Sequence, residues 1–150
     1  MMPNRCRCMP RLEKHAVDGI LYRNGYKYQL VEPATIHVPE LRGYDCEDAF
    51  YRINNGHVTA RRGYAWDGLT GAIDNASAMT PSLVHDIVCQ AVGEKLLPLA
   101  ARTPLGDNAF HRLMIERGTP KLIADWRWWS VDRYVALRGA GTPKPILWAP

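Results

Sequence analysis

The sequence predicts an α+β fold, with N-terminal antiparallel β hairpins followed by a three-helix layer. Turn signals built on asparagine and glycine recur in the first half of the chain, between short runs of β-branched and aromatic residues. Threonine–proline pairs recur in the second half, and each pair is typical of a helix start. The change from one pattern to the other falls between Ala65 and Thr80, so we expect strands before it and helices after it.

Four of the expected strands form two hairpins, and the turn of each hairpin contains an Asn-Gly pair. The strands and turns are Ile20–Arg23 and Tyr26–Glu32 around Asn24-Gly25, and Phe50–Ile53 and His57–Arg61 around Asn54-Asn55-Gly56. Such pairs adopt the positive φ angles that tight hairpins need. A further short strand is expected at Thr35–Val38, and Asp45, Glu47 and Asp48 are expected to form an acidic loop.

Each of the three expected helices begins at a Thr-Pro pair and ends at a glycine. These pairs and glycines are Thr80-Pro81 with Gly93, Thr103-Pro104 with Gly118, and Thr119-Pro120 with Gly139. The threonine hydroxyl accepts a hydrogen bond from the first turn, and glycine adopts the left-handed conformation that ends a helix. Prolines after Gly139 forbid a helix there, so we expect a single domain at residues 1–139 and an extended proline-rich tail at residues 140–150.

Length and composition indicate a globular protein. At 150 residues the chain is long enough for one domain with its own core. No apolar run approaches the roughly 20 residues of a membrane span, and Met1–Arg11 lacks the apolar stretch of a signal peptide, so a cytoplasmic protein is expected. Cys6, Cys8, Cys46 and Cys89 do not have the spacing of a disulfide framework, and no second cysteine pair completes a zinc site, so reduced thiols are expected.

The net charge of +4 is unevenly distributed along the chain. Residues 1–30 contribute +4 and residues 121–150 contribute +3, whereas residues 31–120 contribute −3. Basic ends around an acidic centre favour a cation site over a nucleic-acid groove, which would need positive charge beside the motifs. Nucleic acid is therefore not expected as a partner.

The residues that point most directly to chemistry are His85 and Asp86 in the first expected helix, and Asp107 and His111 in the second. Asp107 and His111 are four residues apart and so share a helix face. If the two helices are antiparallel neighbours, a rise of about 1.5 Å per residue brings His85 to the level of His111, with Asp107 one turn away. All four side chains are then expected to converge between the helices.

A glycine-rich loop, Gly63–Asp74, precedes the first of these helices and carries Asp67. Its glycines allow carbonyl groups to turn toward a hard cation such as calcium, and carboxylate and imidazole ligands also suit zinc. We therefore expect calcium or zinc as a cofactor. The predicted site residues are His85 and Asp107 as catalytic residues, and Asp86, Asp67 and His111 as metal ligands.

In this arrangement His85 is the base that takes a proton from water, and Asp107 fixes the tautomer of its ring. Structural roles are the alternatives. His85 can be a core histidine bound to a backbone carbonyl, Asp86 and Asp107 can be favourable charges near helix starts, and His111 can be a surface residue.

The third expected helix carries apolar residues around much of its circumference, which indicates burial or contact with a partner. Its aromatic residues are Trp126, Trp128, Trp129 and Tyr134. One interpretation is a helix packed over the sheet. The other is an interface for a protein or a lipid, with a polar border made of Arg127, Arg133 and Arg138.

Three motifs together resemble a family of small phage and prophage proteins that is known as a domain of unknown function. They are Gly63-Tyr64-Ala65-Trp66-Asp67-Gly68, Pro81-Ser82-Leu83-Val84-His85-Asp86, and Arg102 followed by Asp107-x-x-Phe110. The resemblance covers about residues 63–135 and implies a phage origin, without an established activity. Two positions depart from the family pattern: Cys89 stands where members carry a tyrosine, and His111 is not part of the pattern.

A looser similarity links the same order of residues to small secreted phospholipases. Those enzymes carry a glycine-rich calcium loop, a helical His-Asp pair and an aspartate on an antiparallel helix. The similarity implies that His85 is the base, Asp86 a calcium ligand and Asp107 the residue that orients His85. The disulfides of those enzymes are absent here.

The sequence thus predicts a small phage-associated hydrolase, in the cytoplasm of the host or on the virion, that acts on a lipid or other cell-envelope substrate. The alternative is a non-catalytic virion or assembly protein, with a phage structural protein as its partner, in which the His and Asp side chains form a structural network. A third hypothesis, a metal phosphohydrolase with His57 as a distant ligand, is disfavoured because His57 falls in an expected strand.

Overall fold

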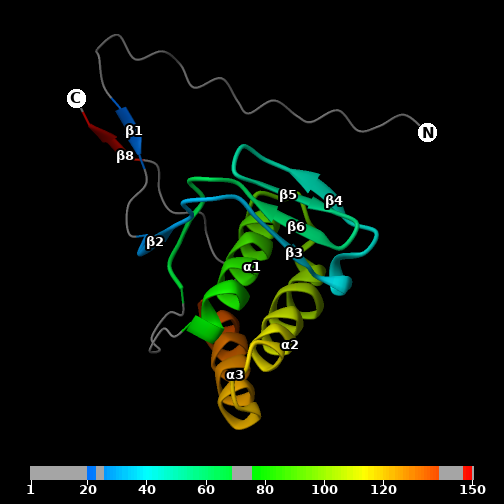
Figure 1. Cartoon of the computed structure of the whole chain (residues 1–150). Coiled ribbons are helices and arrows are strands. Elements are labelled where there is room, and N and C mark those ends of the chain that lie inside the picture. The colour runs from blue at the N-terminus through cyan, green and yellow to red at the C-terminus, as the bar shows by residue number, and fades with distance from the viewer. Residues whose placement is uncertain (1–19, 23–25, 69–75, 139–146, 150) are drawn as a thin grey trace. The chain divides into compact units, whose positions relative to one another are not determined.

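The structure is a computed structural model, and it describes residues 20–22, 26–68, 76–138 and 147–149 (Figure 1). The chain divides into two compact units, Met1–Asn24 with Lys144–Pro150, and Gly25–Pro143. Within the described residues, short antiparallel strands are followed by three α-helices. The predicted α+β fold is therefore confirmed.

In the first unit, strand β1 (Ile20–Tyr22) pairs antiparallel with strand β8 (Leu147–Ala149). The residues of β8 belong to the predicted extended tail, whose residues 140–146 and 150 lie outside the described residues. The hairpin predicted at Asn24-Gly25 is wrong, because β1 pairs with β8, and β2 (Tyr28–Gln29) pairs with β7 (Ala65–Trp66). Long-range pairing here overrides the local turn signal. The division into a domain and a tail at residue 140 stays a prediction.

The second unit contains a four-stranded antiparallel sheet in the order β3-β6-β5-β4. Its strands are β3 (Ala34–His37), β4 (Asp45–Glu47), β5 (Tyr51–Asn54) and β6 (His57–Ala60). The predicted hairpin between β5 and β6 is confirmed. Asn54 pairs with His57, and Asn55 and Gly56 between them have φ angles of 42° and 85°.

The acidic segment predicted as a loop is partly a strand. Asp45 and Glu47 lie in β4, which pairs with β5. Asp48 closes the connection between these strands, because its Oδ1 accepts hydrogen bonds from the backbone N–H groups of Phe50 (2.6 Å) and Tyr51 (2.8 Å). An aspartate that binds the backbone two residues ahead is a common turn former.

In the described part of the chain, three α-helices follow strands β1–β7, and shorter turns of other helix types connect parts of the chain. The α-helices are α1 (Ala76–Gly93), α2 (Asn108–Glu116) and α3 (Lys121–Arg138). The shorter turns are η1 (Pro39–Leu41) and η2 (Leu99–Ala101), which are 3₁₀ helices, and η3 (Arg102–Asp107), which is a π-helix. The predicted ends at Gly93 and Gly118 are confirmed, whereas Gly139 lies outside the described residues.

Two of the three predicted helix starts are wrong. The described part of α1 begins at Ala76 and contains Pro81 as its sixth residue, so Thr80-Pro81 lies inside the helix and does not start it. The predicted start of the second helix, Thr103-Pro104, lies within η3. α3 begins directly after its Thr-Pro pair as predicted, but the Thr119 hydroxyl lies 2.9 Å from the Ser77 hydroxyl of α1.

The main core lies between the sheet and α1, which runs beneath the sheet in Figure 1. The inward side chains of the sheet include Tyr51, Ile53 and Val58, and those of α1 include Ile87 and Val88. A smaller core forms where the three helices meet, and its buried residues are Ala78, Phe110, Met114 and Ala124. α3 therefore packs against α2, and the interpretation of α3 as a helix packed over the sheet is wrong.

We predict that Gly118→Ala lowers the free energy of unfolding by about 1 kcal/mol. Gly118 has φ +92° and its N–H donates to the carbonyl of Ile115, while the N–H of Thr119 donates to the carbonyl of Met114. A Cβ atom at Gly118 would meet nothing within 4 Å, so the cost is backbone strain alone. Urea unfolding measures it. Gly118→Asn should cost less, because asparagine tolerates this conformation better than alanine, and equal costs for both would contradict the explanation.

Candidate active site

The predicted contact between His85 and Asp107 is present. The Nε2 atom of His85 lies 2.9 Å from Oδ1 of Asp107. An ionised carboxylate only accepts hydrogen bonds, so Nε2 donates to Asp107, and Nδ1 is the ring nitrogen that can accept a proton. The Asp107 side chain is 1% exposed and the His85 side chain is 14% exposed. The pair thus joins a buried acid to a histidine that retains limited access to solvent.

Asp107 meets His85 because η3 approaches α1 closely just before α2 begins. Gly106 lies at this approach, and a Cβ atom there would be 3.2 Å from Cγ1 of Val88 and 3.9 Å from Cδ2 of His85. A larger residue would therefore press η3 away from α1. The ring of Phe110 packs against the His85 ring at a centroid distance of 5.4 Å. π-Helical turns such as η3 are rare and frequently occur at functional sites.

Asp86 and Cys89 also lie against the His85 ring. Nδ1 of His85 is 3.6 Å from Oδ1 of Asp86, and Sγ of Cys89 is 3.8 Å from Nδ1 and 3.7 Å from Nε2. The backbone N–H of Asp67 donates to Oδ2 of Asp86 over 3.3 Å, so the glycine-rich loop reaches the site at its first aspartate. Residues 69–74 of that loop lie outside the described residues. Cys89 was not predicted as a site residue, although its place four residues after His85 puts it on the same helix face.

The pKa of His85 is raised well above 6.5 by its neighbours. Burial of the ring opposes the positive charge, but the neighbouring Cys89, Asp107 and Asp86 together outweigh burial. The imidazolium form is therefore favoured at neutral pH. The ring becomes a proton acceptor as the pH rises through the raised pKa.

The expected position of His111 beside His85 is wrong. His111 lies with its Nε2 2.6 Å from Oδ1 of Asp125 on α3. Each residue of an α-helix turns by about 100°, so His111 lies about 40° to one side of Asp107 and Phe110 about 60° to the other. His85 contacts Asp107 and Phe110, and His111 consequently faces α3.

Among the described residues, no group of three or more histidine, cysteine, aspartate or glutamate side chains is arranged to hold a metal ion. Asp86 lies beside the backbone of Asp67, but His111 belongs to the separate pair with Asp125. The described residues do not bring these three predicted ligands together. Binding of calcium or zinc stays a prediction.

α1 is also joined to the strands by polar side chains that the sequence interpretation missed. The hydroxyl of Tyr64 donates to Gln90 (3.1 Å), Gln90 donates to Glu94 (2.8 Å), and the hydroxyl of Tyr51 donates to Glu94 (3.0 Å). Burial raises the pKa of both tyrosines, so their hydroxyls stay protonated donors. The signal in the sequence is the spacing of Asp86, Gln90 and Glu94, which repeats every four residues and marks one polar face of α1.

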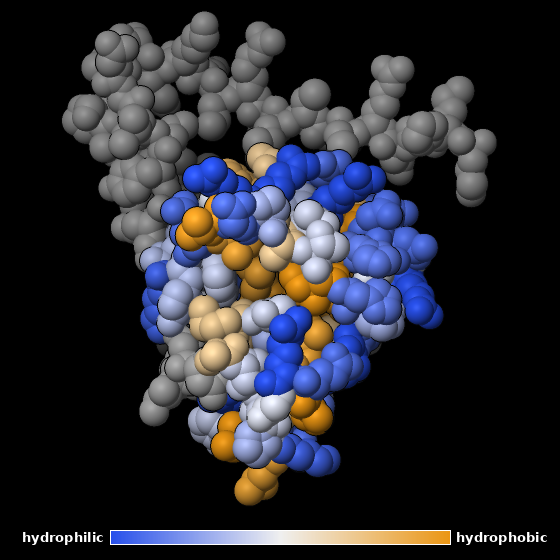
Figure 2. All heavy atoms as spheres, viewed as in Figure 1, coloured by the Kyte–Doolittle hydropathy of each residue, from blue (hydrophilic) through white to orange (hydrophobic). Residues whose placement is uncertain are grey.

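α3 leaves part of its apolar surface exposed. Leu122 is 82% exposed, Trp126 55% and Trp129 52%, and their spacing puts them on one helix face. Figure 2 shows hydrophobic side chains at the end of the molecule where α2 meets α3. Arg127 is buried and so does not border this face as predicted, whereas Arg133 is exposed with its guanidinium 5.6 Å from the Trp129 ring centre. The side chain of the third predicted arginine lies outside the described residues.

Comparison with known proteins gives no match, whether with protein-family models, curated proteins or solved structures. The resemblance to phage proteins and the looser similarity to phospholipases therefore stay predictions from the sequence motifs. Within the described ranges, no helix is both long and apolar enough to cross a membrane.

We predict that His85 stabilises the fold more at low pH than at high pH. A pKa raised in the folded state contributes stability that is fully present below the unfolded value of 6.5 and is lost as the pH rises through the folded value. The difference in unfolding free energy between wild type and His85→Gln should therefore be larger at about pH 6 than at about pH 9. Urea unfolding at the two values measures this difference.

The control for this comparison is His57→Gln. His57 is exposed on β6, its ring lies 5.2 Å from that of His37, and its replacement should change the unfolding free energy little at either pH. A His85→Gln effect that is equal at both pH values, or larger at the higher one, would contradict the raised pKa.

Proposed function

We propose that the chain is a small hydrolase in which His85 activates water and Asp107 orients His85. The observation that supports this function most is the 2.9 Å hydrogen bond from Nε2 of His85 to a carboxylate that is almost fully buried. The contacts of Nδ1 with Asp86 and Cys89, at 3.6 and 3.8 Å, are longer than strong hydrogen bonds. Nδ1 is therefore the atom that can accept a proton from water.

In the proposed reaction, a water molecule donates a hydrogen bond to Nδ1 of His85 and its oxygen attacks the carbonyl carbon or phosphorus of an ester. The water proton passes to Nδ1, and Asp107 stabilises the imidazolium that forms. The same proton then passes to the leaving oxygen as the ester bond breaks, which returns the ring to its neutral form. General acid–base catalysis of this kind contributes about 10²–10⁴-fold to a rate.

From the sequence motifs, the proposal also includes that the protein is phage-associated and acts on a lipid or other cell-envelope substrate. A divalent ion, calcium or zinc, would assist the reaction by polarising the substrate oxygen. Asp86 is the carboxylate that would bind the ion, because it lies beside His85 and beside the backbone of Asp67.

A non-catalytic virion or assembly protein is the second candidate, and the burial of Asp107 favours it. A carboxylate that is 1% exposed and bonded across two helical segments stabilises their packing whether or not His85 acts on a substrate. The two candidates therefore differ in activity, while both predict a cost in stability when the pair is broken.

Assays of carboxylic ester, phosphoester and cell-wall bonds, each with calcium, zinc or manganese supplied, test the hydrolase. We expect His85→Ala to lower the activity by about 10²–10⁴-fold, because it removes the base. Asp107→Asn should also lower it, since an amide can accept the same hydrogen bond but does not stabilise the imidazolium. The wild-type rate should increase as the pH rises through the raised pKa of His85.

The matched control is His57→Ala, which removes an exposed histidine of β6 and should keep full activity. Melting curves accompany each assay, because removing one partner of a buried polar pair costs about 1–3 kcal/mol. If the wild type cleaves none of these bonds and binds none of these ions, and His85→Ala only lowers the melting temperature, the assembly protein replaces the hydrolase.

A further inference from the structure

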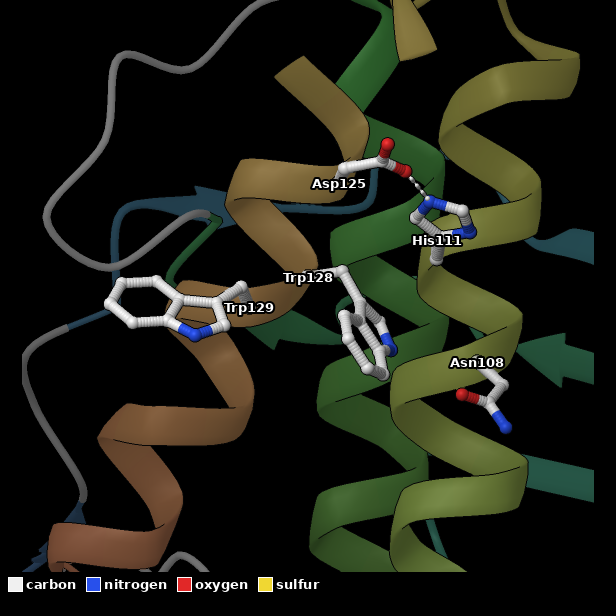
Figure 3. A pocket seen from close by; sticks show the side chains of 5 residues that line it. All are labelled: Asn108, His111, Asp125, Trp128 and Trp129. Atoms are coloured by element: carbon white, nitrogen blue, oxygen red, sulfur yellow. Dashed lines mark hydrogen bonds and ion pairs between the residues drawn. The ribbon is translucent and has the colours of Figure 1, made fainter. Parts of the chain in front are cut away.

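A pocket of about 470 Å³ lies between α2 and α3. Its lining residues are Asn108 and His111 from α2, and Asp125, Trp128 and Trp129 from α3 (Figure 3). Pockets that bind small molecules measure roughly 300–1,000 Å³. The proposed hydrolase does not use this pocket, although the sequence predicted His111 as a metal ligand and Trp128 and Trp129 as part of an interface.

Helix geometry explains why these residues gather. Asn108 and His111 are three residues apart on α2, and Asp125 is three and four residues before Trp128 and Trp129 on α3, so each set shares a helix face. Figure 3 shows the Trp128 ring between the two helices, with Asp125 and His111 together at one end and Asn108 toward the other. The pocket thus has an aromatic wall with polar groups on either side of it.

The carboxylate of Asp125 in the pocket is already paired with other side chains of this chain. Oδ2 of Asp125 lies 2.6 Å from Nζ of Lys121, and Oδ1 lies 2.6 Å from Nε2 of His111. Hydrogen bonds from Lys121 and from His111 lower the pKa of Asp125, so it is ionised at neutral pH. A cationic ligand would have to compete with Lys121 for this carboxylate.

The remaining groups suit a ligand with hydroxyl groups. Asn108 is exposed, and no hydrogen bond of its carboxamide to another described residue is found, so both its donor and its acceptor can serve a ligand. Arg133 already supplies a cation to the Trp129 ring at 5.6 Å. The ring of Trp128 is half-buried and packs edge-on against His111 at a centroid distance of 6.2 Å, which holds its orientation.

We propose that this pocket binds a neutral saccharide. The C–H face of one sugar ring would stack on the Trp128 indole, which provides a large and rigid apolar surface. Sugar hydroxyls both donate and accept hydrogen bonds, so they fit the carboxamide of Asn108 and the paired side chains of His111 and Asp125. Binding at this pocket needs no reaction at His85, and the inference is independent of the proposed hydrolase.

The position of the pocket relates it to the candidate active site. Asn108 directly follows Asp107, and successive residues of a helix point about 100° apart. Asp107 therefore faces α1 and His85, while Asn108 faces the pocket. The two neighbouring residues at the junction of η3 and α2 therefore contribute to the candidate active site and to the pocket.

Calorimetric titration of the full chain with neutral sugars tests the proposal. The probes are glucose, N-acetylglucosamine and the β-1,4-linked dimer of each, with choline as the cationic probe. We expect at least one neutral sugar to bind, with an affinity that falls tenfold or more in Asn108→Ala and in Trp128→Ala. Asn108 is exposed, so its replacement leaves the fold intact even if Trp128→Ala destabilises the helices.

Trp126→Ala is the matched control, because Trp126 is an exposed tryptophan of the same helix outside the pocket lining, and its replacement should leave the affinity unchanged. Three results would overturn the proposal: no neutral sugar binds, only choline binds, or sugar binding survives both pocket substitutions. Because binding is measured without turnover, an inactive hydrolase would not affect the outcome.

Discussion

The hydrogen bond between His85 and Asp107 is the interaction on which the packing of the helices depends. It joins α1 to η3 at the point where the chain turns into α2. A carboxylate as buried as that of Asp107 is costly unless it is paired, so the bond fixes the approach of the two segments. The same bond contributes to the raised pKa of His85. One contact therefore contributes both to the packing of the helices and to the protonation of His85.

Residues from three elements pack around this bond. Gly106 and Phe110 lie against His85 where η3 and α2 meet α1. Asp86 lies toward Nδ1 and also binds the backbone at the end of the strand region, whereas Sγ of Cys89 is as close to Nε2 as to Nδ1. The sheet also stabilises the position of α1, because its inward side chains pack on the apolar face of that helix.

Local sequence signals predicted turns and helix ends better than they predicted which strands pair with each other. The Asn55-Gly56 turn and the helix end at Gly118 depend on backbone conformations that few residues other than glycine and asparagine adopt, and both are confirmed. Asn24-Gly25 carries the same local signal, but β1 and β2 each pair with a strand that is distant in the sequence. The contact of His85 with Asp107 was predictable from two antiparallel helices. The place of His111 was not, because a rotation of about 40° from Asp107 is enough to turn it toward α3.

The most direct measurement of the central claim is an NMR titration of the His85 ring in wild type and in Asp107→Asn. The buried pair predicts that His85 of the wild type titrates well above 6.5, with the proton on Nε2 retained after deprotonation. Asp107→Asn should move that titration to lower pH, because the amide carries no charge to stabilise the imidazolium. A wild-type His85 that titrates at or below 6.5, or a titration that Asp107→Asn leaves unchanged, would contradict the claim that Asp107 orients His85 and stabilises its imidazolium form.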